Sequence, residues 1–322
     1  MQILLRAALV VLVLSGAASA QAPGWPAKPI RIVVPFPAGG GVDFLARAMQ
    51  TRLAEQLGQP VTVDNRAGAG GILGADSVAK SAPDGYTLLM GNSATHAINP
   101  AIHASLPYDP VKDFAAVTWA VNVNFLLAAH PGVPVKSLRE MLELARLRPG
   151  TLSYGSAGNG TATHLAFEML KSLAAIDVVH VPYKGAGQAV IDLAGGQLNF
   201  MIGDLPTLLP LVRSGKLRAL AATSARRSVR LPELPTVAES GLAGYEVVSW
   251  QGLFAPAGTP VAVVSRLNAE AARVLAAADV QARLVEAGND IVAAGPQEYA
   301  AHVRSELAKW TAVAKAAGAK VD

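Results

Sequence analysis

The sequence IRIVVPFPAGGGVD, residues 30–43, decides the fold class of this chain. Residues 30–34 are mostly β-branched and apolar, which predicts a buried strand. A loop rich in proline and glycine follows at residues 35–41, and an amphipathic pattern over about residues 42–57 predicts a helix. A strand, a tight turn and a helix in this order are the repeating unit of an α/β fold.

The same unit recurs along the chain in two series. In the first series, further strands are expected at residues 60–64 and 86–90, with a helix that ends at about Lys80 between them. The second series begins after an apolar stretch at residues 124–130 and a proline-rich joint at residues 131–134. Its strands are expected at residues 152–155, 178–181, 198–202 and 217–223, and its helices at residues 138–147, 161–173 and 188–194, with another opened by Pro206. Successive units of this kind build a parallel sheet with right-handed crossovers.

Two series of units predict two domains, and the length of 322 residues also exceeds the ~150 residues of a typical domain. The extended segment at residues 244–256 is expected to cross back to the first domain. The alanine-rich tail over about residues 261–317 predicts helices, with interruptions at Gly288 and at Gly295-Pro296. We therefore assign residues 21–123 and 250–322 to domain 1, and residues 124–249 to domain 2.

The first 20 residues have the three-part form of a secretory signal peptide. A single cation, Arg6, precedes an uncharged run from Ala7 to Leu14, and small residues end at Ala20. The run is shorter than the ~20 apolar residues that a membrane span requires. We expect cleavage after Ala20 and export to the periplasm, and the lack of cysteine argues against a lipid anchor.

The composition excludes several classes of protein. A hydrophobic content of 52% with 16% charged residues favours large apolar cores over disorder. No cysteine is present, so stability must come from apolar burial and not from disulfides. Without Arg6, 26 Lys and Arg residues face 23 Asp and Glu residues, a charge of +3, and they are mostly scattered singly. Nucleic-acid binding is therefore not expected, whereas a mild positive field favours small anions.

The loop at residues 35–41 is the first candidate ligand site, because ligands of open parallel sheets bind beyond the C-terminal ends of the strands. Its consecutive glycines let backbone N–H groups approach a ligand, and the helix N-terminus that follows supplies unpaired donors with a partial positive charge. These features suit a carboxylate, although an ordinary tight turn is the alternative. Asp43 would repel a carboxylate, so it either caps backbone N–H groups or receives a ligand hydroxyl or ammonium.

A second glycine-rich turn at residues 154–164 mirrors the first in the other half of the chain. Thr161 and His164 are three residues apart, so they share one face of the opening helical turn. His164 could contact a ligand or act only as a structural donor. Two helix N-termini that face each other across a cleft could hold the two ends of a dicarboxylate. Lys184 offers a possible cation nearby, or is a solvated loop lysine.

Motifs of the common enzyme classes are incomplete. The turn at residues 155–158 is not a nucleophile elbow, because the pattern G-x-S-x-G needs glycine where Tyr154 stands. The glycines at residues 68–71 lack the last glycine of a dinucleotide fingerprint, since Leu73 stands there, and no phosphate-loop lysine follows a glycine run. The six histidines show no H-x-x-x-H spacing, so no zinc site is expected.

Many motifs of the mature chain resemble those of the tripartite tricarboxylate transporter receptor family, also called Bug receptors. They are Trp25-Pro26, Pro29-Ile30, and residues 35–43, 64–71, 83–87, 154–164, 181–185, 215–220 and 234–236. The resemblance implies a two-domain Venus-flytrap fold like that of type II periplasmic binding proteins. Each domain would be a mainly parallel sheet flanked by helices, with a hinge of crossing strands.

The resemblance also implies that the two glycine-rich loops grip carboxylate groups of the ligand, often with ordered water. The candidate ligand-binding residues are Pro37, Ala38, Gly39, Gly40, Asp43, Asn92, Ser93, Ser156, Gly158, Thr161, His164 and Asp204. Relatives often have an Asp-Asn pair where this chain has Gly203-Asp204, which leaves the ligand preference on that side open. Ligands of the family include citrate, dicarboxylic amino acids, and nicotinate-like and other aromatic carboxylates.

We therefore expect a monomeric periplasmic receptor, not an enzyme, that captures a small di- or tricarboxylate, an acidic amino acid or an aromatic carboxylate. It would deliver the ligand to inner-membrane transporter subunits or to a signalling partner. No cofactor, metal or nucleic acid is expected. The alternative is a periplasmic serine hydrolase that uses Ser156 and His164.

Overall fold

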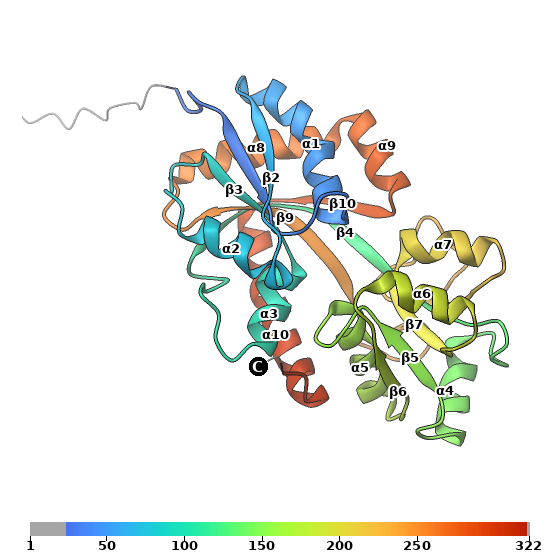
Figure 1. Cartoon of the computed structure of the whole chain (residues 1–322). Coiled ribbons are helices and arrows are strands. Elements are labelled where there is room, and N and C mark those ends of the chain that lie inside the picture. The colour runs from blue at the N-terminus through green and yellow to red at the C-terminus, as the bar shows by residue number, and fades with distance from the viewer. Residues whose placement is uncertain (1–23, 321–322) are drawn as a thin grey trace, which may run out of the picture.

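The computed structural model describes residues 24–320, which form two lobes joined by crossing strands (Figure 1). The predicted signal peptide and its cleavage site lie outside the described residues. The first part of the chain contains β1 (Ile30–Val34), α1 (Gly41–Leu57), β2 (Val61–Asn65), the 3₁₀ turn η1 (Ala69–Gly71), α2 (Ile72–Ala79), β3 (Thr87–Asn92), the π-helical turn η2 (Ala94–Ile98) and α3 (Asn99–Ile102). These elements confirm the strand–turn–helix units expected from the sequence.

The second part of the chain begins with a long strand and continues with the second series of units. It contains β4 (Phe114–Ala129), α4 (Leu138–Leu147), β5 (Ser153–Ser156), α5 (Ala162–Ala174), β6 (Val179–Pro182), α6 (Ala186–Ala194), β7 (Phe200–Asp204), α7 (Leu205–Arg213) and β8 (Arg218–Ala222). The chain then returns through β9 (Val248–Pro256), α8 (Val261–Ala276), α9 (Ala278–Glu286), β10 (Asn289–Ala294) and α10 (Pro296–Ala317).

Each lobe is built around a trio of parallel strands. In the first lobe β1 lies between β2 and β3, and in the second lobe β5 lies between β6 and β7. Because the strands of a trio are parallel, their C-terminal ends share one edge of the sheet. β1 and β5 lead from this edge through a glycine-rich loop into α1 and α5 respectively. The fold therefore gives both predicted ligand loops the same place in their lobes.

The strands β4 and β9 cross between the lobes. β4 pairs antiparallel with β9 and β10 as far as Asn124, and from Phe125 onward it pairs antiparallel with β7 and β8. The complete sheet is consequently mixed, with parallel trios joined by antiparallel strands. The α/β class is confirmed, and the domain limits at residues 123/124 and 249/250 remain a prediction at the point where these strands cross.

Two segments differ from the sequence-based expectation. Residues 124–130 were expected only as an apolar stretch, but residues 124–129 are the last six residues of the sixteen-residue strand β4. The tail was expected to be helical with interruptions at Gly288 and Gly295, but the residues between those two glycines form the strand β10. Both strands depend on antiparallel pairing with distant residues, and local periodicity carries no signal for such pairing.

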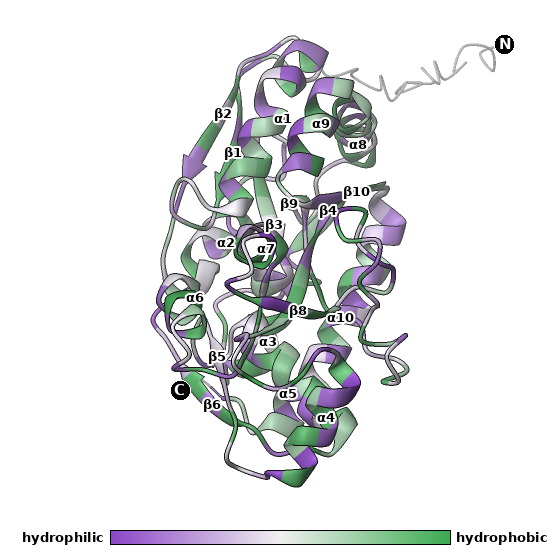
Figure 2. Cartoon of the chain, turned by 90° about the vertical axis from the view of Figure 1, so that its right-hand side faces the viewer, coloured by the Kyte–Doolittle hydropathy of each residue, from purple (hydrophilic) through white to green (hydrophobic). Residues whose placement is uncertain are grey.

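Apolar residues hold the lobes together. In the first lobe α1 and α8 pack on the sheet through side chains such as Leu45 and Leu267, both fully buried. A second cluster contains Phe167 of α5 together with Trp250 of β9 and Trp310 of α10, so it extends across both lobes. Figure 2 shows hydrophobic residues along the central strands and an alternation of hydrophobic and hydrophilic residues along the helices. Within residues 24–320, no helix is both long and apolar enough to cross a membrane.

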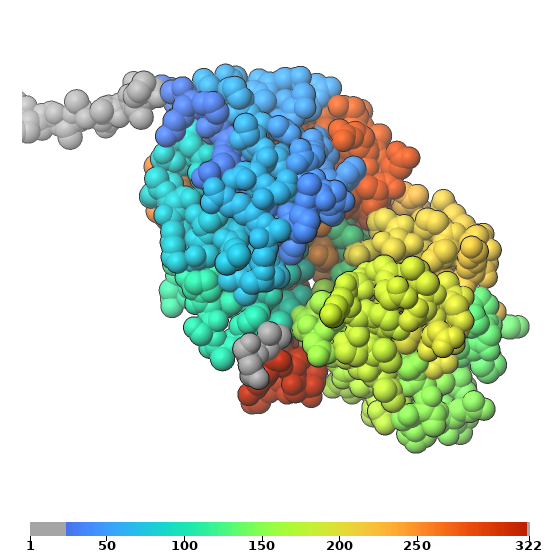
Figure 3. Space-filling view, viewed as in Figure 1, coloured from blue at the N-terminus to red at the C-terminus, as the bar shows by residue number. Residues whose placement is uncertain are grey.

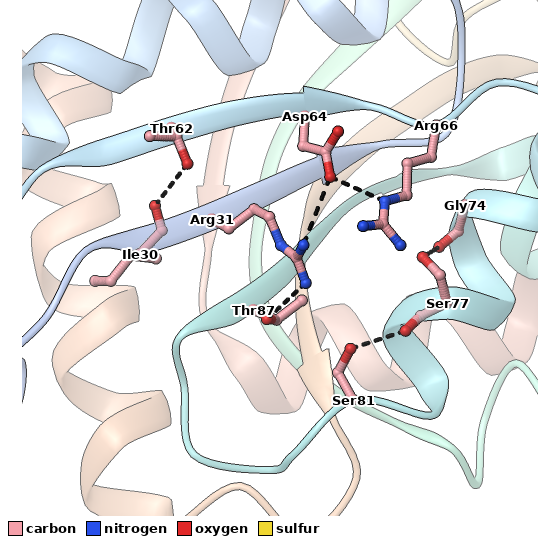
Figure 4. A network of polar contacts seen from close by, with 9 residues as sticks. All are labelled: Ile30, Arg31, Thr62, Asp64, Arg66, Gly74, Ser77, Ser81 and Thr87. Atoms are coloured by element: carbon pink, nitrogen blue, oxygen red, sulfur yellow. Dashed lines mark hydrogen bonds and ion pairs between the residues drawn. The ribbon is translucent and has the colours of Figure 1, made fainter.

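A polar network on the sheet surface joins the three strands of the first lobe (Figure 4). Asp64 of β2 accepts a hydrogen bond from Arg66 at 2.9 Å and lies 3.7 Å from Arg31 of β1. Arg31 in turn donates to the hydroxyl of Thr87 of β3 at 3.4 Å. These charged side chains are 36 to 42% exposed, so each ion pair contributes at most about 1 kcal/mol. Core packing, not this network, holds the strands together.

Candidate functional site

The first glycine loop, residues 35–40, presents backbone donors to solvent. Pro37, Ala38, Gly39 and Gly40 are all exposed. Gly39 has a φ of 85°, a left-handed conformation that favours glycine. Gly40 is the N-cap of α1 and no side chain caps that helix end. The first N–H groups of α1 therefore lack the side-chain acceptor that normally covers them, as an anion-binding helix end requires.

Asp43 stabilises this loop through hydrogen bonds of its carboxylate. Its carboxylate accepts hydrogen bonds from the Gly39 amide at 2.9 Å, from Arg47 Nε at 2.9 Å and from Asn65 Nδ2 at 2.9 Å. Burial alone would raise the pKa of Asp43, but the hydrogen bonds outweigh burial and hold the pKa below its usual value. Because both carboxylate oxygens have protein partners, the geometry fits the capping interpretation of Asp43.

Asn92 and Ser93 lie where β3 ends. The Asn92 side chain accepts from the Thr95 amide at 3.2 Å, and the Asn92 amide donates to the Thr95 hydroxyl at 3.1 Å, so Asn92 shapes the turn into η2. The Ser93 hydroxyl lies 3.2 Å from the hydroxyl of Ser249 on β9. This contact ties the end of β3 to a crossing strand.

The second glycine loop, residues 156–161, has its own internal bracing. Thr161 is the N-cap of α5: its hydroxyl accepts from the His164 amide at 3.4 Å and donates to the Gly158 carbonyl at 2.7 Å. Gly158 has a φ of 132°, and a Cβ there would lie only 3.0 Å from the Tyr183 carbonyl oxygen. Glycine is required at that position by both conformation and space.

His164 is held as a neutral donor. The Gly160 amide donates to His164 Nδ1 at 3.1 Å, so Nδ1 is the acceptor and the ring proton resides on Nε2. Burial lowers the pKa of His164, which favours this neutral form. The bond to Gly160 leaves Nε2 free to donate. The ring is therefore suited to donating one hydrogen bond from the start of α5.

The two lobes meet along a groove (Figure 3). Atoms in the colours of β4 and β9 are visible where the lobes join, and the N-terminal end of α1 points toward the second lobe in Figure 1. The two loops thus occupy corresponding positions on either side of the crossing strands. Among residues 24–320, no cluster of three or more His, Asp or Glu side chains could hold a metal ion.

This arrangement matches a known family. The family model described as the tripartite tricarboxylate transporter family receptor matches residues 45–319 of the chain. The chain belongs to this family. The receptor is 37% identical over 306 residues to Protein BugT of Bordetella pertussis. The aligned residues cover 95% of the receptor and 94% of BugT. It is 41% identical over 287 residues to the UPF0065 protein in the tcbD-tcbE intergenic region of Pseudomonas sp. strain P51. The aligned residues cover 89% of the receptor and 85% of that protein.

Solved structures agree with the receptor in fold. An R. palustris protein with adipate has a TM-score of 0.80 and 39% identity, covering 92% of the receptor and 100% of that chain. MatC from Rhodopseudomonas palustris with bound malate has a TM-score of 0.75 and 36% identity, covering 89% and 99%. These relatives are solute-binding receptors, and the periplasmic binding protein BugD is a further structural neighbour. The receptor is accordingly a solute-binding protein and not an enzyme.

Ser156 pairs with a histidine that the sequence did not single out. Its hydroxyl lies 2.7 Å from His180 Nε2 in the receptor, whereas His164 accepts from Gly160, so the pairing of Ser156 with His164 in the hydrolase alternative is wrong. Ser156 is also fully buried, which places its hydroxyl out of reach of a substrate or ligand in this conformation. Burial and the neighbouring His164 lower the pKa of His180 to about 4. His180 lies within the strand β6, where sequence pattern gave no signal.

Two further residues singled out from the sequence, Asp204 and Lys184, lie outside the two glycine loops. Asp204 is the N-cap of α7 but its side chain does not cap the helix, and burial raises the pKa of its carboxyl group. It pairs with Phe125 in the register of β7 against β4, which places it at the crossing strands. Lys184 is exposed on the loop after β6. Asp204 is therefore near the junction of the lobes, while the possible cation at Lys184 is solvated.

Proposed function

We propose that the receptor captures a small linear dicarboxylate between its lobes, one carboxylate at the start of α1 and the other at the start of α5. The observation that carries this proposal is the pair of glycine loops, each placed after a parallel strand and before a helix N-terminus. The first loop exposes N–H groups that no side chain caps, and the second adds the Nε2 donor of His164. Solved relatives with adipate and with malate support this ligand class.

Neutral donors suffice for useful affinity. Each charge-assisted hydrogen bond contributes roughly 1.5 to 3 kcal/mol, and each helix terminus up to about 2 kcal/mol when partly buried. Micromolar binding requires about 8 kcal/mol in total, so a few such bonds at each end of the ligand are enough after ordering costs. A ligand that contacts both lobes only when they are closed would also favour the closed form.

The proposal extends to location and partners. Export to the periplasm with cleavage after Ala20 fits a family whose solved members include periplasmic binding proteins. The receptor would act as a monomer and pass its ligand to inner-membrane transporter subunits, or to a signalling partner. Acidic amino acids, citrate and aromatic carboxylates are the other ligand classes to compare.

A pair of matched helix caps tests the site. Thr161 caps α5 at the second glycine loop, and Ser137 caps α4, where its hydroxyl accepts from the Glu140 amide. We expect Thr161→Ala and Ser137→Ala each to lower the free energy of unfolding by about 1 kcal/mol. Only Thr161→Ala should also weaken binding of malate or adipate, by roughly 10-fold, because the Thr161 hydroxyl holds the second glycine loop in place through the Gly158 carbonyl and the His164 amide.

The measurements are titration calorimetry for binding and urea denaturation for stability. Thermal-shift screening of malate, succinate, adipate, citrate, glutamate and benzoate with the unaltered receptor comes first, because a ligand that binds the folded state must raise its stability. If no carboxylate raises the melting temperature, the proposed function is wrong. If Thr161→Ala and Ser137→Ala bind the ligand equally well, the ligand site lies elsewhere.

A further inference from the structure

Gln251 has an unusual position on the crossing strand β9. Its side chain is 4% exposed, and its backbone pairs with Asn92 of β3 on one side and with Val121 of β4 on the other. A strand that is paired on both sides cannot shift easily, so the direction of the Gln251 side chain is fixed by the sheet. That direction is toward α1: a Cβ atom built on Gly41, the first residue of α1, would lie 3.6 Å from Gln251 Nε2.

The carboxamide of Gln251 is unsatisfied. Its Oε1 is buried without a hydrogen-bond partner, and its Nε2 lies beside the start of α1. Buried polar groups are nearly always paired in folded proteins, because an unpaired group loses its bonds to water without replacement. This carboxamide, whose buried oxygen is unpaired, therefore lies beside the N–H groups at the start of α1, which no side chain caps.

The N–H groups at the start of α1 and the Nε2 of Gln251 are donors that lie close together, and such a group of donors suits an anion. The two cations that flank this loop in sequence already have partners: Arg31 lies 3.7 Å from Asp64, and Arg47 is bound to Asp43 and to Asn65. The donors left at this place are then neutral, namely the backbone amides of α1 and the Gln251 carboxamide. A carboxylate offers about four lone-pair directions and can accept from both kinds of donor at once.

We propose that Gln251 is a ligand-binding residue that donates a hydrogen bond from Nε2 to the carboxylate held at the start of α1. This inference rests on the proposed function and adds to it a donor that comes from the crossing strand and not from either glycine loop. The ligand carboxylate is then held by both a helix end and the strand about which the lobes are joined.

The alternative is that Gln251 is structural and that its amide oxygen accepts from an N–H group of α1. Amide orientation decides between the two, and the substitution Gln251→Met separates them because it keeps the length of the side chain and removes both polar atoms. If Gln251 serves the ligand, Gln251→Met removes an unpaired group from the ligand-free receptor, so the melting temperature should stay the same or rise. If Gln251 is structural, the melting temperature should fall.

The experiment measures binding of malate and of adipate by titration calorimetry, and the melting temperature of the ligand-free receptor. We expect Gln251→Met to weaken binding of the ligand by about 10- to 100-fold, the effect of one hydrogen bond to a charged group, without loss of ligand-free stability. Gln281→Met, at an exposed position on α9, is the matched control and should change neither quantity.

Three outcomes would overturn the inference in distinguishable ways. Unchanged affinity in Gln251→Met, with a receptor that binds the probe normally, refutes the role of Gln251 alone. Failure of the unaltered receptor to bind malate, adipate or any other carboxylate of the panel refutes the proposed function, and the role of Gln251 with it. A lower melting temperature together with unchanged affinity assigns Gln251 to the structure of the loop.

Discussion

Asp43 shows how a single carboxylate can shape a ligand loop without touching the ligand. It accepts from Gly39, Arg47 and Asn65, so its removal leaves the Gly39 amide and the Arg47 guanidinium without their partner. We expect Asp43→Ala to lower the free energy of unfolding by about 1 to 3 kcal/mol and to weaken binding of malate or adipate as the loop loosens. Urea denaturation and calorimetry measure the two effects.

The control for Asp43 is Asp279, whose side chain is 56% exposed and pairs with Arg52 on the surface. Asp279→Ala should change the stability by less than about 1 kcal/mol and leave binding intact. Equal effects of the two substitutions would mean that the bracing of the first glycine loop contributes nothing beyond an ordinary surface ion pair.

Residues of the site differ in how readily sequence reveals them. Gly39, Gly158 and Thr161 stand in strand–turn–helix junctions, where the chemistry of turns and caps makes them visible in one sequence. Gln251 and His180 lie inside strands, and their importance depends on which loop their side chains meet. These contacts depend on the tertiary structure, so periodicity and local motifs could not predict them.

At the scale of elements, the close approach of β9 to its neighbours depends on glycine. A Cβ atom on Gly252 would lie 2.2 Å from the Thr118 carbonyl oxygen of β4 and 2.8 Å from the Tyr299 hydroxyl of α10. No side chain fits there without movement of the backbone. We expect Gly252→Ala to lower the free energy of unfolding by more than about 3 kcal/mol, measured by urea denaturation.

Gly187 in α6 is the matched control, because a Cβ atom there would have no neighbour within 4 Å. In a helix, alanine is favoured over glycine by about 0.5 to 1 kcal/mol, so Gly187→Ala should be neutral or stabilising. A Gly252→Ala receptor as stable as the unaltered one would show that β4 and β9 are not held as closely as the structure indicates.

Elements formed by local pattern were predicted well, whereas those that depend on distant partners were not. α1 begins one residue earlier than expected and ends at Leu57 as expected, because an amphipathic stripe and the left-handed residue Gly58 define it. β10 was missed because a short segment of mixed character becomes a strand only when it pairs with residues 119–123 of β4. The last six residues of β4 were expected only as an apolar stretch for the same reason.

The whole molecule is a pair of α/β lobes that share two strands, and this plan follows from the repeated units in the sequence. The repeated units did not predict that the sheet is mixed. β4, β8, β9 and β10 pair antiparallel with strands far away in the chain, which local sequence patterns do not reveal. A cluster of aromatic and histidine side chains covers the crossing strands, with His96 stacked on Phe254 at 3.8 Å and His302 stacked on Trp119 at 3.7 Å.

That cluster makes the stability of the receptor depend on pH. Burial lowers the pKa of His96 to about 3, and burial together with Lys309 lowers the pKa of His302 to about 4 despite the opposing effect of Glu306. The ordinary pKa is 6.5, so between about pH 6.5 and 4 the unfolded chain binds more protons than the folded one. Stability from these rings is complete above pH 6.5 and is lost as the pH falls toward 4.

Replacing one ring tests this account. Phenylalanine at position 302 can retain the stacking on Trp119 but cannot be protonated. Between pH 7 and pH 4 the free energy of unfolding should therefore fall less in His302→Phe than in the unaltered receptor. The two decreases should differ by about 1 to 3 kcal/mol. Urea denaturation at several pH values measures the difference. Parallel curves for the two proteins would show that His302 takes up its proton equally well in the folded and unfolded states, and the acid sensitivity would then have to arise from the other buried groups.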